Sequence, residues 1–209
     1  MSVQEANWKY AEDYPNESPV LAKARKLSAE LGVEAIGPGA GAALAMAAAT
    51  SGARAIAEIG TGVGVSGLWL LAGAPEATLT TIDIEPEHQQ QARALFAEAG
   101  IPATRVRAIG GDALTVLPRM NDASYDLVVI DADPANVLEY VEHALRLVRT
   151  GGSVLIPRVL RGGRLADPAK RDAVTTDLRT LLEELRGSGA VLVSLLPVGD
   201  GLLHIHRRD

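Results

Sequence analysis

The chain has 209 residues, the size of one α/β domain, and a formal net charge of −6 at pH 7. This acidic balance argues against a nucleic-acid partner, because nucleic acid favours a basic protein face. The sequence contains no cysteine, which excludes disulfides, thiolate nucleophiles and thiolate metal ligands.

The sequence pattern offers neither a secretory leader nor a membrane span. Its first residues lack the basic and apolar regions of a signal peptide, and the most apolar stretch, 40–50, is too short to cross a bilayer. We therefore expect a cytoplasmic protein with no membrane partner.

Residues 1–50 differ in character from the rest of the chain, and we expect them to form a helical arm or lid on a core of residues 51–209. Trp8, Tyr10 and Tyr14 are three of only seven aromatic residues in the sequence. Prolines at 15 and 19 separate them from two helical patterns at 19–31 and 39–50. The three rings suit a substrate lid, a dimer contact or simple packing of the arm onto the core.

Seven apolar runs of strand length follow, and helical patterns such as 86–99 and 135–148 lie between most of them. This alternation predicts a mostly parallel sheet covered on both faces. Gly100 is placed to end the first of these helices, and Gly151 with Gly152 to end the second. The loop 197–201 is too short for a crossover helix, so the last two runs are expected to pair as an antiparallel hairpin. The runs are 55–59, 78–84, 105–109, 127–131, 153–157, 191–196 and 202–206.

A glycine-rich segment at 58–67 joins the first run to a helical pattern at 66–72. Its glycines permit positive φ and a close approach of backbone N–H groups to a ligand. The segment also satisfies the dinucleotide pattern G-x-G-x-x-G. However, Glu58 at the strand end would repel a pyrophosphate and attract an ammonium group, which favours S-adenosylmethionine (SAM).

Two further carboxylates follow successive runs and complete this predicted site. Asp83 ends the second run, where it can accept the hydroxyl hydrogens of a ribose, and Asp112 follows the third run near the expected adenine position. The alternative is structural: the glycines make a tight turn, and Asp83 caps the helix that begins at Pro86.

Blocks along nearly the whole chain resemble the catechol and caffeoyl-CoA type O-methyltransferases in their small bacterial form. They occur in family order: AIGP at 35–38, EIGTGVGVS at 58–66, TIDIEP at 81–86, GDA at 111–113, YDLVVIDAD at 125–133 and PVGDGL at 197–202. The resemblance implies a Rossmann-like methyltransferase fold with a seven-stranded sheet, a small-molecule acceptor and often a homodimer.

The resemblance also implies roles for single residues in binding SAM. Ile36 and Gly37 would line its methionine end, Ser66 would hold its carboxylate, and Glu58 would lie near its amino group. Asp83 would bind the ribose, and Asp112 with Ala113 the adenine side. The implied cofactor set is completed by Gly60, Thr61, Gly62, Ile84 and Asp131.

The chemistry that the resemblance implies departs from the family pattern at the metal site. Such proteins usually hold a divalent cation with one Asp after the fourth strand and an Asp-Asn pair after the fifth, helped by a Lys. Asp131 retains the first ligand, but the pair reads Pro157-Arg158 and the Lys position reads Pro134. One carboxylate does not satisfy the octahedral oxygen coordination of Mg²⁺, so we expect no metal.

A metal-free transfer is the leading hypothesis. The fixed charge of Arg158 would steady an acceptor oxyanion, and Asp133 would orient the acceptor or take its proton. We therefore expect Asp131, Asp133 and Arg158 to be catalytic, on a small phenolic or acidic hydroxyl compound. The alternative for Arg158 is a surface residue paired with Asp131.

Several other readings stay open from the sequence alone. One alternative is a catalytically degenerate SAM-binding protein that keeps the cofactor cleft but has lost catalysis. Another is an NAD(P)-dependent reductase that binds its cofactor at the glycine-rich segment, although this chain lacks the Tyr-x-x-x-Lys pair of such enzymes.

Two further groups of residues have open roles. His204 and His206 share one strand face but lack a third metal ligand. Arg161 and Arg164 either border the acceptor pocket and attract an acidic substrate or lie in a solvated loop.

Overall fold

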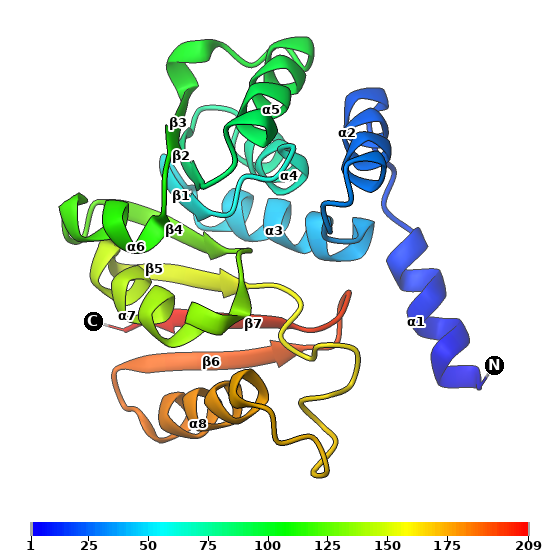
Figure 1. Ribbon diagram of the computed structural model, residues 1–209, viewed down its shortest axis with the longest axis vertical. Coiled ribbons are helices and arrows are strands. Elements are labelled where there is room, and N and C mark those ends of the chain that lie inside the picture. Colours follow the sequence, from blue (N-terminus) through cyan, green and yellow to red (C-terminus); the bar gives the residue numbers. More distant parts are fainter. Residues whose placement is uncertain (1, 209) are drawn as a thin grey trace.

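A computed structural model describes residues 2–208 and contains one seven-stranded sheet (Figure 1). The strand order is β3-β2-β1-β4-β5-β7-β6; β1 to β5 are parallel, and β7 runs antiparallel to both β5 and β6. The strands are β1 (Ala55–Ile59), β2 (Thr78–Asp83), β3 (Val106–Gly110), β4 (Tyr125–Ile130), β5 (Val148–Ile156), β6 (Val191–Leu196) and β7 (Leu202–Arg207). The predicted mostly parallel sheet with an antiparallel C-terminal hairpin is therefore confirmed.

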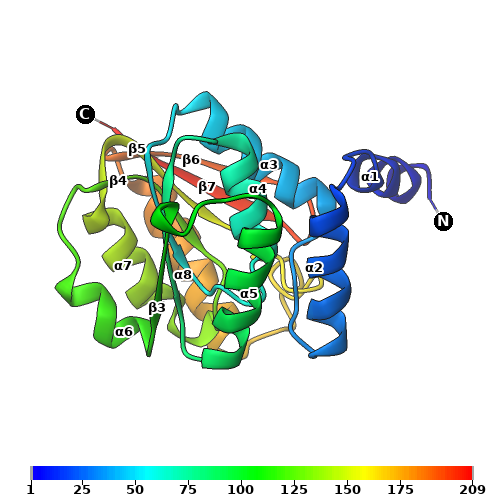
Figure 2. The same ribbon diagram turned by 90° about the horizontal axis from the view of Figure 1, so that it is seen from above.

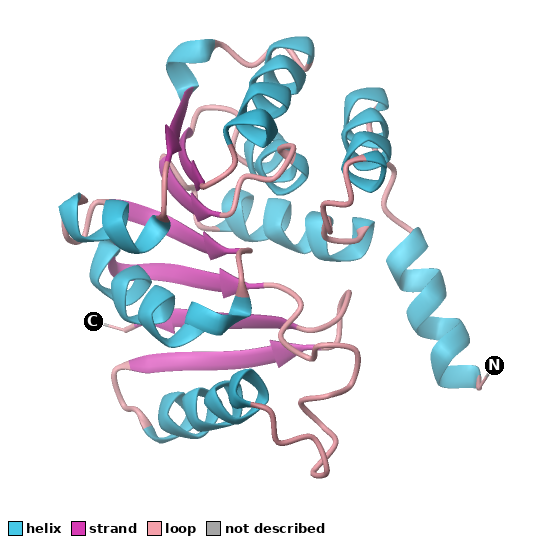
Figure 3. Cartoon of the chain, in the orientation of Figure 1, coloured by secondary structure: helices cyan, strands magenta, loops and turns pink. Residues whose placement is uncertain are grey.

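Helices cover both faces of the sheet (Figures 2 and 3). One buried cluster joins one face to α2, α3, α4 and α5, and a second joins the other face to α6, α7 and α8. The helices are α1 (Val3–Asp13), α2 (Pro19–Glu30), α3 (Pro38–Thr50), α4 (Val65–Gly73), α5 (Pro86–Glu98), α6 (Ala113–Val116), α7 (Val137–Leu147) and α8 (Ala173–Gly187), with short 3-10 turns η1 (Ala103–Arg105), η2 (Leu117–Arg119) and η3 (Pro134–Asn136). None of the described helices is both long and apolar enough to cross a membrane.

The N-terminal helix α1 projects from the body of the molecule and has no buried residue (Figure 1). The sequence pattern gave only a polar segment here, but Ser2 and Glu5 form a capping box that starts a helix. Glu12 near its end joins α1 to the core: its two carboxylate oxygens accept the backbone N–H groups of Gly39 and Gly199, each at 3.0 Å. The Glu12 carboxylate thereby caps the N-terminus of α3, whose own N-cap residue is a glycine.

The amino ends of β4 and β5 differ from the sequence prediction in one detail. The expectation that Gly151 and Gly152 end a helix is wrong, because α7 ends at Leu147 and both glycines lie inside β5. They lie opposite a register shift between β4 and β5, where Gly151 adopts a φ of 73°. Asp126 joins the start of β4 to the start of β1, since its Oδ2 accepts the N–H groups of Arg54 and Ala55 at 2.7 and 2.8 Å.

The close packing of α3 on α4 depends on Gly73. A Cβ atom at this position would lie 2.0 Å from the carbonyl oxygen of Ala45 in the backbone of α3. We expect Gly73→Ala to lower the free energy of unfolding by about 1–3 kcal/mol, because the two helices must move apart. The control is Gly187→Ala in the last turn of α8, where an added Cβ meets nothing within 4 Å. Denaturant unfolding of both variants checks this; equal stabilities would contradict it.

Candidate active site

A cavity of about 1000 Å³ opens at the carboxyl ends of the parallel strands. This is the edge at which open α/β sheets bind ligands, and the volume is at the upper end of the usual range of roughly 300–1000 Å³ for ligand pockets. Strand order divides the cavity into two halves. One lies over the ends of β1, β2 and β3, and the other over the ends of β4 and β5 and the loop between β6 and β7. The cavity therefore has room for two ligands side by side.

The glycine-rich loop forms the β1 side of the cavity. Gly60, Gly62 and Gly64 all have positive φ, at 94°, 49° and 91°. Each of their N–H groups is already used, since Gly60 donates to a β2 carbonyl, Gly62 to the Asp83 carboxylate and Gly64 within the loop. None of these three N–H groups is therefore free for a pyrophosphate, which weighs against the dinucleotide reading of the motif.

Asp83 is held rigidly at the end of β2. Its Oδ2 accepts the N–H of Gly62 at 2.7 Å, its Oδ1 accepts the N–H of Glu85 at 2.9 Å, and the ring of His88 lies 3.9 Å away. Each carboxylate oxygen keeps a second lone pair. The side chain can thus accept hydroxyl hydrogens from a ligand without giving up the bonds that orient it.

Glu58 lies beneath the glycine loop and is fully buried. Its Oε2 accepts the hydroxyl of Thr81 at 2.6 Å, while its Oε1 has no hydrogen-bond partner. Burial raises the pKa of Glu58 to about 7, although the hydroxyl groups of Ser66 and Thr81 favour the charged form. A buried carboxylate with a free acceptor is costly unless a donor or a positive charge comes near it. The residue therefore suits a site for a cationic ligand.

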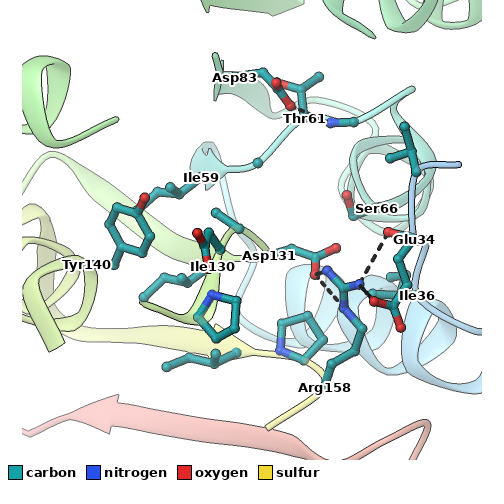
Figure 4. Close-up of a pocket in the computed structure, with 18 of the residues that line it drawn as sticks. Glu34, Ile36, Ile59, Thr61, Ser66, Asp83, Ile130, Asp131, Tyr140 and Arg158 are labelled. Carbon is teal, nitrogen blue, oxygen red and sulfur yellow. Dashed lines mark hydrogen bonds and ion pairs between the residues drawn. The ribbon is translucent and has the colours of Figure 1, made fainter. Parts of the chain in front are cut away.

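Arg158 occupies the other half of the cavity and joins three loops (Figure 4). Its Nε and Nη2 donate to Oδ1 of Asp131 at 3.0 and 2.5 Å, and its Nη1 lies 3.0 Å from Oε2 of Glu34. The Asp131 carboxylate is almost fully buried, and this burial raises its pKa despite the adjacent guanidinium. Arg158 itself has a φ of 61°, an uncommon conformation for a residue other than glycine. The pair with Asp131, which the structural alternative for Arg158 expected, is therefore present, although the Arg158 side chain lies in the cavity and is only 24% exposed.

The positions that would complete a metal site hold other residues. Pro157 and Arg158 follow β5, and Pro134 begins η3 after β4. Among residues 2–208, no three His, Cys, Asp or Glu side chains are grouped so that they could hold a metal ion.

Nearly all of the predicted site residues come together in this cavity. The exceptions are Glu58, which is buried beneath the loop, and Gly37, which is the N-cap of α3 and packs against the carboxylate of Glu12. The predicted residues that line the cavity are Ile36, Gly60, Thr61, Gly62, Ser66, Asp83, Ile84, Asp112, Ala113, Asp131, Asp133 and Arg158.

Sequence reasoning missed several residues that line the cavity, among them Glu34, His88, Asn136 and Tyr140. Tyr140 lies on the buried face of α7, and burial raises the pKa of its hydroxyl. The helical spacing of Val137, Tyr140, Val141 and Ala144 directly after the Asp133 loop was a signal for it. The other three lie in loops or at a helix start, where the residue pattern carries little information.

The histidines of β7 lie outside the cavity. His206 Nδ1 is 3.2 Å from the Ser153 hydroxyl, and burial lowers the pKa of His204, helped by the nearby His206. Neither residue belongs to the candidate active site.

The raised pKa of Glu58 predicts a specific dependence of stability on pH. The folded state holds the proton up to about pH 7, whereas the unfolded chain loses it near the ordinary value of 4.5. Stability should therefore fall as the pH rises from about 4.5 to 7, by about 3 kcal/mol from this group.

We expect Glu58→Gln to remove most of this fall and to be more stable than the parent chain at pH 8. The Tm of both proteins, measured from pH 5 to 8, checks this. The matched control is Glu142→Gln on the solvent side of α7, which should keep the parent profile. Parallel profiles for the Glu58 variant and the parent would contradict the assignment.

Comparisons with known proteins agree with this geometry. A family model described as O-methyltransferase matches residues 11–208. A Mycobacterium tuberculosis protein named as an O-methyltransferase is 47% identical over 200 residues, covering 95% of this chain and 89% of the relative. A Corynebacterium glutamicum crystal structure aligns with a TM-score of 0.91 and 34% identity, covering 100% of this chain and 98% of that one. The tomaymycin-synthesis O-methyltransferase of Streptomyces achromogenes, solved with SAM, aligns over the full length of both chains with a TM-score of 0.87 and 31% identity. The chain belongs to the O-methyltransferase family.

Proposed function

We propose that the protein transfers a methyl group from SAM to a hydroxyl group of a small phenolic or acidic acceptor, without the divalent cation that usually assists this chemistry. The observation that carries the proposal is Arg158. Arg158 occupies the position of metal ligands that this chain lacks. It is hydrogen-bonded to Asp131, the one carboxylate of the usual metal site that the chain retains.

The cofactor half of the cavity fits SAM, which supplies a methyl group on a positively charged sulfonium. Asp83 and Asp112 line this region, Asp131 after β4 lies at its border with the other half, and the unpartnered Oε1 of Glu58 lies beneath it. This acidic surrounding attracts a cation, and the oriented Asp83 carboxylate can accept two hydroxyl hydrogens. The residues therefore fit the group that the family relationship implies.

The half of the cavity over the ends of β4 and β5 is the acceptor half. Its residues can position the acceptor and stabilise a negative charge on the acceptor oxygen. Arg158 donates from Nε and Nη2 to Asp131, and its Nη1 contacts both the backbone carbonyl and Oε2 of Glu34, which leaves the second N–H of Nη2 for an acceptor oxygen. Asp133 uses Oδ1 to accept the N–H of Ala135 at 2.9 Å, so its Oδ2 remains available to take a hydroxyl hydrogen.

These roles suffice for methyl transfer to an acidic hydroxyl. The reaction is an in-line displacement whose rate depends chiefly on holding the two reactants close and aligned. A phenol with a pKa of about 10 needs little help from a base, so one carboxylate and one guanidinium replace the metal and the lysine. Asp133 takes the proton of the hydroxyl while Arg158 stabilises the negative oxygen.

A second candidate is a SAM-binding protein that has lost catalysis. One observation favours this second candidate: Asp131 and Glu34 together neutralise the guanidinium charge of Arg158. The two candidates differ in turnover and not in cofactor affinity.

Calorimetry and a turnover assay under the same conditions test the proposal. We expect SAM to bind with the same affinity in EDTA and in added Mg²⁺, and a panel of phenols to be methylated at rates that EDTA leaves unchanged. SAM binding without turnover on any phenol would favour the non-catalytic candidate. A requirement for Mg²⁺ would overturn the metal-free mechanism.

Arg158→Ala should lower kcat on a phenolic acceptor by about 10²-fold, the typical effect of losing one oxyanion donor. The SAM dissociation constant should change by no more than a few-fold. Arg149→Ala is the matched control, because Arg149 also pairs with an aspartate, Asp126, but at the amino end of the strands away from the cavity. Equal kcat values for the two variants would show that Arg158 has only a structural role.

A further inference from the structure

The segment after β5 carries two more arginines into the same cavity. Arg161 and Arg164 both line it, and they lie in the long connection between β5 and α8. Because β5 lies beyond β4 in the sheet, this connection borders the acceptor half, on the far side from β2 and β3. Neither arginine contributes to the cofactor site described above.

The connection is held in place by its own hydrogen bonds. Arg179 of α8 donates to four backbone carbonyl oxygens of the connection, those of Arg164, Leu165, Asp167 and Lys170, at distances between 2.6 and 3.1 Å. Arg161 adopts a φ of 52°, which non-glycine residues rarely adopt. Retained backbone strain of this kind is concentrated at ligand sites. The two arginines are therefore presented to the cavity by a preformed loop.

Asp172 alone pairs with these two charges among residues 2–208. Arg161 Nη1 lies 3.0 Å from Asp172 Oδ1, and Arg164 Nη2 lies 2.7 Å from Oδ2. Two guanidinium groups thus share one carboxylate, which leaves one positive charge in excess. Asp200 also lines the cavity, but it accepts the N–H of Gly162 and lies more than 4.0 Å from both guanidinium groups.

Several N–H groups of Arg161 and Arg164 have no hydrogen-bond acceptor. Arg161 Nε and Nη2 make no hydrogen bond within the described part of the chain, and Arg164 Nε is buried without one. Guanidinium groups favour planar oxyanions such as carboxylates, which they bind through two parallel hydrogen bonds. A carboxylate matches the single excess charge, whereas a phosphate monoester carries about −1.5 to −2.

We propose that Arg161 and Arg164 form a subsite for a carboxylate of the acceptor, separate from the hydroxyl group that is methylated. This inference rests on the proposed function and narrows its substrate class to hydroxylated aromatic acids. In this arrangement Arg158 faces the reacting oxygen and the Arg161–Arg164 pair holds the other end of the same small molecule.

Three matched acceptors test the subsite: 3,4-dihydroxybenzoate, the neutral 3,4-dihydroxybenzyl alcohol and catechol. We expect 3,4-dihydroxybenzoate to bind the enzyme loaded with demethylated SAM at least 10-fold more tightly than the two neutral compounds, measured by calorimetry. The preference should weaken at high salt, because it is electrostatic. Equal binding of the three compounds would overturn the proposal.

The double variant Arg161→Gln/Arg164→Gln should lose about 10- to 100-fold in affinity for 3,4-dihydroxybenzoate and little for the neutral compounds. Its SAM affinity should stay that of the parent, which shows that the cavity is intact. Arg161→Lys/Arg164→Lys keeps the charge and should recover part of the affinity. Loss for all three acceptors alike, in both variants, would show that the arginines only shape the loop and would overturn the proposal.

Binding and turnover separate this inference from the function on which it rests. Selective binding of 3,4-dihydroxybenzoate without methylation would leave the subsite standing and remove the proposed reaction. Methylation of neutral phenols, with no preference for 3,4-dihydroxybenzoate, would support the proposed reaction and overturn the carboxylate subsite.

Discussion

The ion pair between Arg158 and Asp131 is the interaction on which the candidate active site depends. It places a permanent positive charge beside an almost fully buried carboxylate, at the point where β4 and β5 end and where Glu34 of the N-terminal segment reaches the cavity. Removing Arg158 would leave the Asp131 carboxylate as an uncompensated charge in a poorly solvated place, which is destabilising, whereas Arg158 without Asp131 would keep Glu34 as its partner. The pair therefore fixes three loops relative to one another and decides what chemistry the acceptor half can perform.

The two halves of the cavity differ in the charged groups that they offer to a ligand, and the order of the strands explains this. Carboxylates follow β1, β2 and β3 or lie beneath their loops, so this half favours a cationic cofactor. The three arginines that line the cavity all follow β5, beside Glu34, Asp131 and Asp133, so the other half alone offers guanidinium donors to an oxygen that becomes negative. A displacement between a sulfonium and an oxygen nucleophile needs this separation, because charge moves from one reactant toward the other as the bond forms.

Much of the fold could be predicted from the sequence, because alternating strand and helix patterns repeat and because Gly60, Asp83 and Asp112 occur at strand ends in family order. The residues that long-range contacts determine could not be predicted. Glu34 comes next to Arg158 only through folding, across 124 positions of sequence. Gly151 and Gly152 looked like a helix end because local turn chemistry does not reveal a register shift between β4 and β5. The hydrogen bonds from Glu12 to Gly39 and Gly199 likewise follow from tertiary packing, which local propensity does not encode.

A crystal structure of the protein with demethylated SAM and 3,4-dihydroxybenzoate, grown with Mg²⁺ present, distinguishes a metal-free acceptor site from a metal-assisted one. We expect the reacting hydroxyl oxygen within hydrogen-bond distance of Arg158, the carboxylate on Arg161 and Arg164, and no cation between Asp131 and the acceptor. A magnesium ion bound to Asp131 and both hydroxyl oxygens, with Arg158 displaced, would contradict it.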